Sequence, residues 1–426
     1  MNIYFRTALI IFFSLLATAH DLRAQKETWW HGIEREIHYK PVGSDFVLVK
    51  GKRRFNRALY GSNTAFRAEA GDLPEFALYL PGMGGNLKFG LQKGDSSKWL
   101  IDAKQIETCY RPGSMLYKIE DPLLDKGRLF LTVLPLYNEE GLVVKVAGEN
   151  VPAGIKLLAV FGGATGQKFS RDGDIGADPE SSFYLKPEYC RNNLYTLQKN
   201  RFTLLFGFKK PLTEEERYEV QHLPAGKEAI TDKKDLPKML TGIFPATSQL
   251  KIVDAVQQQS PSLLWQSGGT EMPAVAAQLP LQNKAEYFLL QNGKTERSVA
   301  GVPAIFKQAE AAREALANRI QVATPDSFIN TLGGALSVAA DAIWEAPSYM
   351  HGAVAWRMRL NGWRGPYVAD VLGWHDRARQ HFSAYALSQV TQPETGPVVM
   401  DTALHLGRGA EKMGTSFFSS GYISRN

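Results

Sequence analysis

The sequence predicts an antiparallel β-sandwich followed by a helical region. The chain has 426 residues, more than one ordinary domain needs, so two domains with separate cores are expected. From Trp29 to about Ala300, short apolar runs are broken by Gly, Pro, Asn and Asp, with no long helical pattern between them. At Val302 the spacing of apolar residues changes to that of a helix.

The first 24 residues have the pattern of a secretion signal. Residues 1–6 form a short basic start, residues 7–16 an apolar run, and residues 17–19 or 22–24 a small-residue cleavage site. The apolar run is shorter than the roughly 20 residues of a membrane span, and no later segment comes close. We therefore expect a signal peptide at residues 1–24 and an exported, periplasmic or extracellular protein.

The predicted sandwich occupies residues 25–300. Runs of apolar and β-branched residues within it have the length of strands. These runs are 46–49, 76–80, 129–134, 142–146, 156–161, 202–208 and 287–290. The charged stretches 213–218 and 233–238 predict solvated loops or short surface helices.

Charge and cysteine content narrow the classes of partner and site. The net charge of +6 is spread along the chain, and the longest basic cluster, residues 50–54, lies in a strand-like region. This argues against a nucleic-acid partner, which needs a dense basic field. The two cysteines, Cys109 and Cys190, could pair in an exported protein, and the sequence leaves this open. Two isolated thiols do not make a metal site, and no metal is assigned.

Two helices follow the sandwich. Residues 301–323 form a predicted linker helix, because one stripe carries apolar residues at intervals of three and four. The stripe consists of Ile305, Ala309, Ala312, Leu316 and Ile320. For the next helix, Thr324 offers a capping hydroxyl and Pro325 the first helical position. Its apolar stripe consists of Phe328, Leu332, Leu336, Ala339 and Ile343.

Three glycine-rich segments are candidates for ligand loops. Residues 162–168 lack the spacing of a phosphate-binding loop, and residues 82–85 lack the strand and helix of a nucleotide fold. Both predict turns that need positive φ. Residues 172–178 place three carboxylates in one loop, which leaves open an exposed acidic turn, a calcium loop with an incomplete ligand set, or a loop that reaches the active site. No cofactor is predicted.

Residues 363–382 combine aromatic and charged side chains in a way that suits a carbohydrate. Sugars present apolar C–H faces flanked by hydroxyls, so their sites combine ring platforms with directional polar groups. The candidate platforms are Trp356, Trp363, Tyr367 and Trp374. The candidate polar groups are Arg357, Arg364, Asp370, His375, Asp376 and Arg377.

A purely structural interpretation of the same segment stays open. A third helix is predicted from about 376 to 390, and Asp376 could be its N-cap. Trp356 and Trp363 could pack in a core, and Arg377 could be solvated. His351 is interpreted as structural.

Several motifs resemble the start of the (α/α)6 catalytic barrel of six-hairpin glycosidases. They are residues 324–326, a helix with Phe328 and Asn330, the aromatic-rich stretch 344–356, and residues 373–376. Glucoamylases and disaccharide phosphorylases share the order of sandwich, linker helix and barrel. More closely, residues 51–61 and 169–178 resemble an uncharacterised family of exported bacterial proteins assigned to that superfamily.

The resemblance implies that residues 324–426 are an incomplete (α/α)6 barrel and that Asp376 binds sugar hydroxyls, with Trp374 and His375 beside it. This sequence has His375 where relatives usually have Arg. Arg364, Tyr367 and Asp370 complete the expected substrate-binding set. A twelve-helix barrel needs roughly 300 residues or more, so we expect a truncated chain without its catalytic acid.

The resulting expectation is the N-terminal portion of an exported glycoside hydrolase acting on an oligo- or polysaccharide, with catalytic residues unknown and phosphorolysis left open. One alternative is a carbohydrate-binding protein whose sandwich uses Trp29, Trp30 or Trp99. Another is a polysaccharide lyase using Tyr367 and His375 as acid and base.

Overall fold

The structure is a computed structural model, and it describes residues 38–169, 179–208, 237–269, 271–354, 357 and 364–386. The expected signal peptide, Trp29, Trp30, the loop 172–178 and the stretch 213–218 lie outside the described residues.

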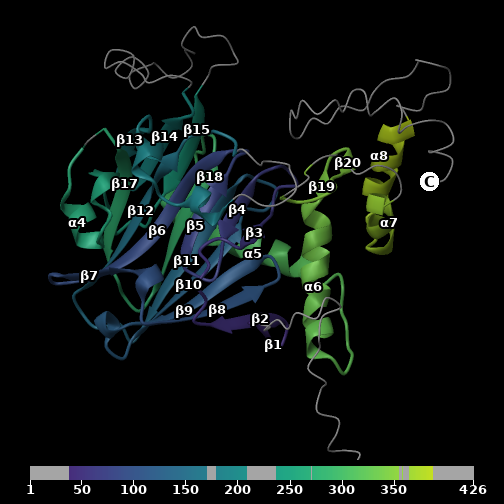
Figure 1. Cartoon of the computed structure of the whole chain (residues 1–426), viewed down its shortest axis with the longest axis horizontal. Coiled ribbons are helices and arrows are strands. Elements are labelled where there is room, and N and C mark those ends of the chain that lie inside the picture. The colour runs from purple at the N-terminus through teal and green to yellow at the C-terminus, as the bar shows by residue number, and fades with distance from the viewer. Residues whose placement is uncertain are drawn as a thin grey trace, which may run out of the picture. The chain divides into compact units, whose positions relative to one another are not determined.

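The first sheet has ten strands, and its neighbouring strands run antiparallel (Figure 1). In spatial order they are β1 (Lys40–Val42), β2 (Asp45–Val49), β8 (Gln105–Arg111), β9 (Ser114–Glu120), β10 (Arg128–Pro135), β11 (Gly141–Glu149), β18 (Ala285–Asn292), β15 (Lys238–Ile243), β14 (Arg201–Phe206) and β13 (Leu194–Gln198).

The second sheet has eight strands and faces the first. Its main path is β16 (Gln249–Asp254), β17 (Pro273–Pro280), β12 (Ile155–Ala164), β6 (Met83–Lys93), β5 (Glu75–Tyr79), β4 (Arg67–Ala70) and β3 (Arg57–Leu59), while β7 (Ser96–Trp99) pairs with β6. Short helical turns connect the strands. They are η1 (Leu100–Asp102), η2 (Pro122–Leu124), η3 (Glu180–Phe183), α2 (Pro187–Cys190), η5 (Ala255–Gln257), α4 (Pro261–Gln266) and η6 (Val299–Gly301).

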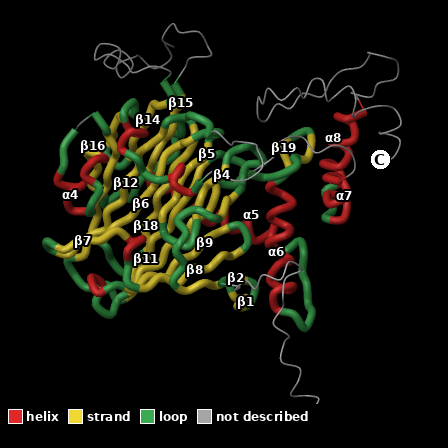
Figure 2. Tube along the Cα trace, viewed as in Figure 1, coloured by secondary structure: helices red, strands yellow, loops and turns green. Residues whose placement is uncertain are grey.

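The main core lies between the two sheets and follows from the alternation of side chains along each strand. In β10, Leu129, Leu131 and Val133 are buried while Arg128 is exposed. Aromatic rings fill the interior, with Phe89 and Phe288 from opposite sheets 5.1 Å apart. The predicted antiparallel β-sandwich is confirmed, and Figure 2 shows its strands gathered on one side of α6.

Several strands carry too many charged or small residues to be recognised from apolar runs. β4 holds Arg67 and Glu69, both buried on the outer face of its sheet, and β17 has the sequence PAVAAQLP. β15 begins at Lys238, where the lysine-rich sequence predicts a loop or a short surface helix. These strands are specified by their neighbours in the sheet more than by their own composition.

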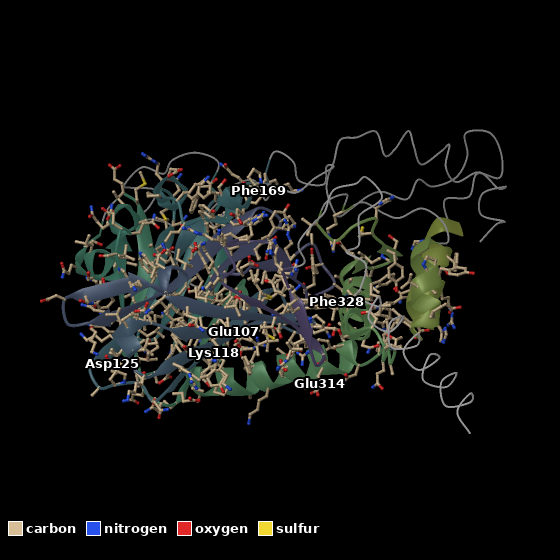
Figure 3. The ribbon with its side chains drawn as sticks, turned by 60° about the horizontal axis from the view of Figure 1, so that its bottom comes forward. Glu107, Lys118, Asp125, Phe169, Glu314 and Phe328 are labelled. Atoms are coloured by element: carbon tan, nitrogen blue, oxygen red, sulfur yellow. The ribbon has the colours of Figure 1, made fainter. Side chains whose placement is uncertain are left out.

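Helix α5 (Val302–Ala317) covers part of the outer face of the ten-stranded sheet. Val302 and Ala309 pack against a second apolar cluster that includes Leu134 and Leu289. Phe306 packs on Tyr287, with ring centroids 5.5 Å apart. Figure 3 shows Glu314 on this helix.

Helix α6 (Ser327–Ala342) corrects two expectations. Its N-cap is Asp326, whose carboxylate accepts hydrogen bonds from the N–H groups of Phe328 and Ile329, so Thr324 is not the cap. Thr324 instead bonds the side chain of Asn330. Phe328, labelled in Figure 3, lies 6.4 Å from Phe46 of β2.

The apolar stripe predicted for α6 is not the face of the helix that is buried. Leu332 and Leu336 are 43% and 57% exposed, while the buried positions include Thr331, Gly333 and Ser337. The reason is close packing, because a Cβ added at Gly334 would lie 3.2 Å from the carbonyl oxygen of Ala317. Small residues therefore face the neighbouring segment and the large apolar ones do not.

The remaining described elements are β19 (Trp344–Glu345), β20 (Ser348–Tyr349), α7 (Arg364–Val371) and α8 (His375–Ala386). Trp344, Tyr349, Ala369 and Ala378 form their small core. Gly365 and Pro366 lie in the first turn of α7, where Gly365 leaves room for Tyr349. α8 starts one residue earlier than predicted, and residues 387–390 lie outside the described part.

The cysteines do not form a disulfide: Cys190 is buried and Cys109 is partly buried. Burial raises the pKa of each thiol to about 12. In the described part of the chain, no helix is both long and apolar enough to cross a membrane.

We expect Gly242→Ala to destabilise the sandwich by about 1–3 kcal/mol because the position is overpacked. The new Cβ would lie 2.1 Å from the ring of Phe202, which is fully buried and stacked on Phe161. Denaturant unfolding gives the change. Gly268→Ala is the matched control, since nothing lies within 4 Å of its Cβ position. Equal midpoints for the two variants would contradict this packing.

Candidate functional site

A pocket of about 280 Å³ lies where one end of the sandwich meets the helices. We call it the junction pocket. It is lined by the turn between β3 and β4, the turn between β10 and β11, helices α5 and α6, and the start of α8. Its rings and polar side chains are Tyr60, Tyr137, Trp374, Asn63, Asn138, Asp341, Arg313, Arg319 and Arg377.

A closed set of hydrogen bonds joins three of these residues. The carboxylate of Asp341, in the last turn of α6, accepts from Arg377 Nη1 at 2.7 Å and from Asn63 Nδ2 at 3.3 Å. Arg377 Nη2 also donates to Asn63 Oδ1 at 3.3 Å. Asn63 has φ of 50°, a left-handed conformation that asparagine adopts more readily than most residues. The turn, α6 and α8 are thereby fixed around one edge of the pocket.

Trp374 already contacts two guanidinium groups. The Cζ atoms of Arg319 and Arg377 lie 5.1 and 4.6 Å from the centroids of its ring system. Arg319 Nη1 also donates to the carbonyl of Leu372 at 2.7 Å. Part of the ring surface expected for a sugar is therefore used by arginine through cation–π contact.

Arg313 is neutralised beside the pocket. Its Nε and Nη2 atoms donate to the carboxylate of Glu310 at 3.0 and 2.8 Å, and its Nη1 donates to the carbonyl of Pro112 at 3.1 Å. This pair lies on consecutive turns of α5, so it also supports the helix.

Tyr60 contributes its ring to the pocket. Its hydroxyl is buried and has no hydrogen-bond partner among the described residues. Burial raises the pKa of Tyr60 above its usual range, and the charge of Glu69 acts in the same direction, against Arg67 and Arg357. The phenol therefore stays protonated.

Arg357 was expected to bind ligand, but it is 1% exposed and has a structural role. Nη2 donates to the carbonyl of Thr64 at 2.6 Å and to Glu345 at 2.8 Å. Nη1 donates to the carbonyls of Ala342 and Ala353, both at 3.3 Å. This guanidinium connects the sandwich turn with the end of α6.

The predicted substrate-binding residues do not gather in one place. Trp374 and Arg377 line the junction pocket, but Asp370, His375 and Asp376 do not. His375 Nδ1 lies 2.6 Å from Asp370 Oδ1, and both side chains are about two-thirds exposed. Asp376 is in the first turn of α8, 87% exposed, with Arg379 at 3.8 Å. Tyr367 is 67% exposed.

Other candidates fall outside the described residues or into the core. Nothing is described of Trp356, Trp363 or the side chain of Arg364. Trp99, considered as a sugar platform on the sandwich, is 4% exposed and donates its indole N–H to the carbonyl of Gln258 at 2.9 Å. Lys88 lies 4.3 Å from its ring. Trp99 is therefore part of a buried apolar cluster, and its ring is not accessible to a sugar.

The junction pocket has side chains that could bind a ligand, but its described lining lacks the pair of carboxyl groups that glycoside hydrolysis needs. Asp341 is the single carboxylate among the residues that line it, and it is bonded to Arg377. Inverting glycoside hydrolysis needs two carboxyl groups about 6.5–9.5 Å apart. The described residues contain no group of three or more His, Cys, Asp or Glu side chains that could hold a metal.

Sequence reasoning missed Asn63, Asp341 and Arg319. Asn63 and Asp341 are 278 positions apart, so no local pattern connects them. Asp341 lies between Ala339 and Ile343 of the predicted apolar stripe. A charged residue beside that stripe was the one sequence feature that could have indicated a polar contact there.

The family described as "Domain of unknown function (DUF4450)" matches residues 80–310, which is more than half of the chain. The chain belongs to the DUF4450 family. The match covers most of the sandwich and reaches α5, and stops before α6 of this DUF4450 chain. A search of the curated proteins finds no match.

Solved structures similar to the DUF4450 chain include three glycoside hydrolases. A bacterial glucoamylase complexed with acarbose is 10% identical with a TM-score of 0.40, covering 80% of this chain and 53% of its own. A GH92 inverting mannosidase from Bacteroides thetaiotaomicron is 10% identical with a TM-score of 0.31, covering 72% and 36%. An α-N-acetylgalactosaminidase from Bifidobacterium bifidum, in complex with GalNAc, is 8% identical with a TM-score of 0.22, covering 67% and 41%. The DUF4450 chain thus spans about half the length of the glucoamylase and less than half the length of the other two enzymes.

We expect Arg357→Met to lower the free energy of unfolding by about 3–5 kcal/mol, because it leaves Glu345 and several buried carbonyls without their donor. Chemical denaturation measures the loss. Arg379→Met is the control, since Arg379 is 78% exposed and its change should stay within about 0.5 kcal/mol. If the two variants unfold at the same denaturant concentration, the connecting role of Arg357 is wrong.

Proposed function

We propose that this chain is the sandwich-bearing N-terminal portion of an exported glycoside hydrolase that acts on an oligo- or polysaccharide, and that the junction pocket binds one sugar unit of that substrate. The supporting observation is the composition of the pocket. The lining residues combine the aromatic side chains of Tyr60, Tyr137 and Trp374 with polar side chains such as that of Asn138. A sugar site needs both, aromatic rings for the C–H faces and polar groups for the hydroxyls.

The size of the pocket fits this role. Its 280 Å³ is near the lower end of the volumes typical of small-molecule sites, which suits one sugar unit better than a long oligosaccharide. Tyr137 is 50% exposed, so a bound sugar at the mouth can extend into solvent.

We propose that residues 301–323 link the sandwich to the beginning of an (α/α)6 barrel at residues 324–426. The exposed apolar side chains of α6 and α7 support this. Ile329, Leu332 and Leu336 on α6 are 49%, 43% and 57% exposed, and Val371 on α7 is 82% exposed. Apolar helix faces of this kind are normally covered by further packing.

The exposed residues near the pocket have a second proposed role. Tyr367, Asp370, His375 and Asp376, with Arg364, would contact further sugar units of a longer substrate. The exposure of Tyr367 and of the Asp376 carboxylate leaves both accessible to a ligand.

Calorimetric titration of the purified chain with neutral and acidic oligosaccharides tests the binding role. We expect Tyr137→Ala to weaken binding about threefold to tenfold, the usual contribution of a ring contact. Tyr137 is half exposed, so little structure is lost with it. Tyr367→Ala is the comparison at the outer surface. A loss confined to Tyr367→Ala would move the site to α7 and refute the pocket, and a loss with neither variant would refute both positions.

We expect the chain by itself to release no reducing ends from the saccharides that it binds, because the pocket supplies one carboxylate. A reducing-sugar assay over several hours measures this, with a characterised glycosidase as the positive control. Sustained turnover by the purified chain would show that the catalytic pair is already present.

A further inference from the structure

The junction pocket carries an excess of positive charge that a site for a neutral sugar does not need. Its lining residues include three arginines and a single aspartate, an excess of two positive charges. Glu310, just outside, compensates Arg313 through two hydrogen bonds. Asp341 compensates Arg377. One arginine, Arg319, is left without a carboxylate partner in the described part of the chain.

We propose that the junction pocket selects saccharides that carry an anionic oxygen group, a carboxylate or a sulfate, and that Arg319 binds this group. The inference rests on the proposed function and names its substrate class. Arg319 is exposed, so its guanidinium is accessible to a ligand, and a carboxylate or sulfate oxygen can accept a charge-assisted hydrogen bond that a neutral sugar does not offer.

The contacts of Arg319 leave it able to bind an anion. One N–H group donates to the carbonyl of Leu372, and the guanidinium lies over Trp374. Stacking uses the flat face of the guanidinium and keeps the N–H groups at its edge directed outward. An arginine has five such donors, and paired donors match the two oxygens of a carboxylate or sulfate.

The surrounding residues favour an anionic sugar over a free anion. Tyr60, Tyr137 and Trp374 add ring surfaces to the pocket, and a bare sulfate or phosphate ion would contact none of them productively. An acidic saccharide satisfies the arginine with its charged group and the rings with its C–H faces.

Matched ligand pairs on the unmodified chain test the proposal. The pairs are methyl glucuronide with methyl glucoside, methyl galacturonide with methyl galactoside, and each neutral sugar with its 6-sulfate. Calorimetry or ligand-observed NMR gives the affinities, and inorganic sulfate is titrated separately. We expect at least one acidic member to bind on the order of tenfold to a hundredfold tighter than its neutral partner, as for hydrogen bonds to a charged group. Raising the salt concentration should weaken that acidic ligand alone.

Variants locate the effect. Arg319→Gln should remove the preference, so that the acidic and neutral members of a pair bind alike, and Arg319→Lys should retain part of the preference because the charge remains. Arg379→Gln is the control, since Arg379, like Arg319, is an exposed arginine of the helical part but lies outside the pocket. Unfolding midpoints of all three variants exclude a loss of folding.

Each result is decisive. If neutral members bind as tightly as acidic ones, the anionic preference is wrong and the sugar site stands. If no saccharide binds, the proposed function and this inference both fail. If inorganic sulfate matches the acidic sugars, the pocket is an anion site and the sugar assignment fails. If Arg379→Gln and Arg319→Gln have equal effects, the preference does not come from the pocket.

Discussion

The burial of one guanidinium group fixes how the helices meet the sandwich. Arg357 is almost fully buried, and a charge in that position is tolerated because a carboxylate and three backbone carbonyls accept its N–H groups. Those acceptors belong to the sandwich turn, the end of α6, β19 and the segment after β20. The donors of arginine are held in one plane, so its partners must adopt a narrow set of positions.

The junction pocket follows from this constraint. Its walls are turns of the sandwich on one side, and on the other the second half of α5, the end of α6 and the start of α8. Such positions are exposed to solvent in each region taken alone, so they can carry polar residues at little cost to either core. Around the pocket the two regions are joined through the polar contacts of Asn63 with Asp341 and Arg377, while apolar contacts such as Phe46 with Phe328 lie elsewhere along the junction.

Sequence reasoning reached the sandwich because alternating apolar residues directly encode which face of a strand is buried, as in Leu129, Leu131 and Val133. It failed on α6, where the close approach of Ala317 to Gly334 decided which face was buried and Leu336 was left exposed. The pocket was out of reach for a related reason, since Asn63 and Asp341 meet only after both regions have folded. Trp374 was recognised from local density of aromatic and charged residues, but its partner Arg319 lies 55 positions earlier.

The carboxylate of Asp341 serves two purposes at once. It holds Asn63 and Arg377 together across the joint, and it lies on the surface that a ligand would touch. A ligand that accepts a hydrogen bond from Arg377 therefore competes with Asp341 and weakens these contacts. A ligand that binds while the contacts stay intact stabilises them. If a ligand binds only when the contacts of Asp341 with Asn63 and Arg377 are formed, it stabilises those contacts by the same free energy by which their formation strengthens its binding.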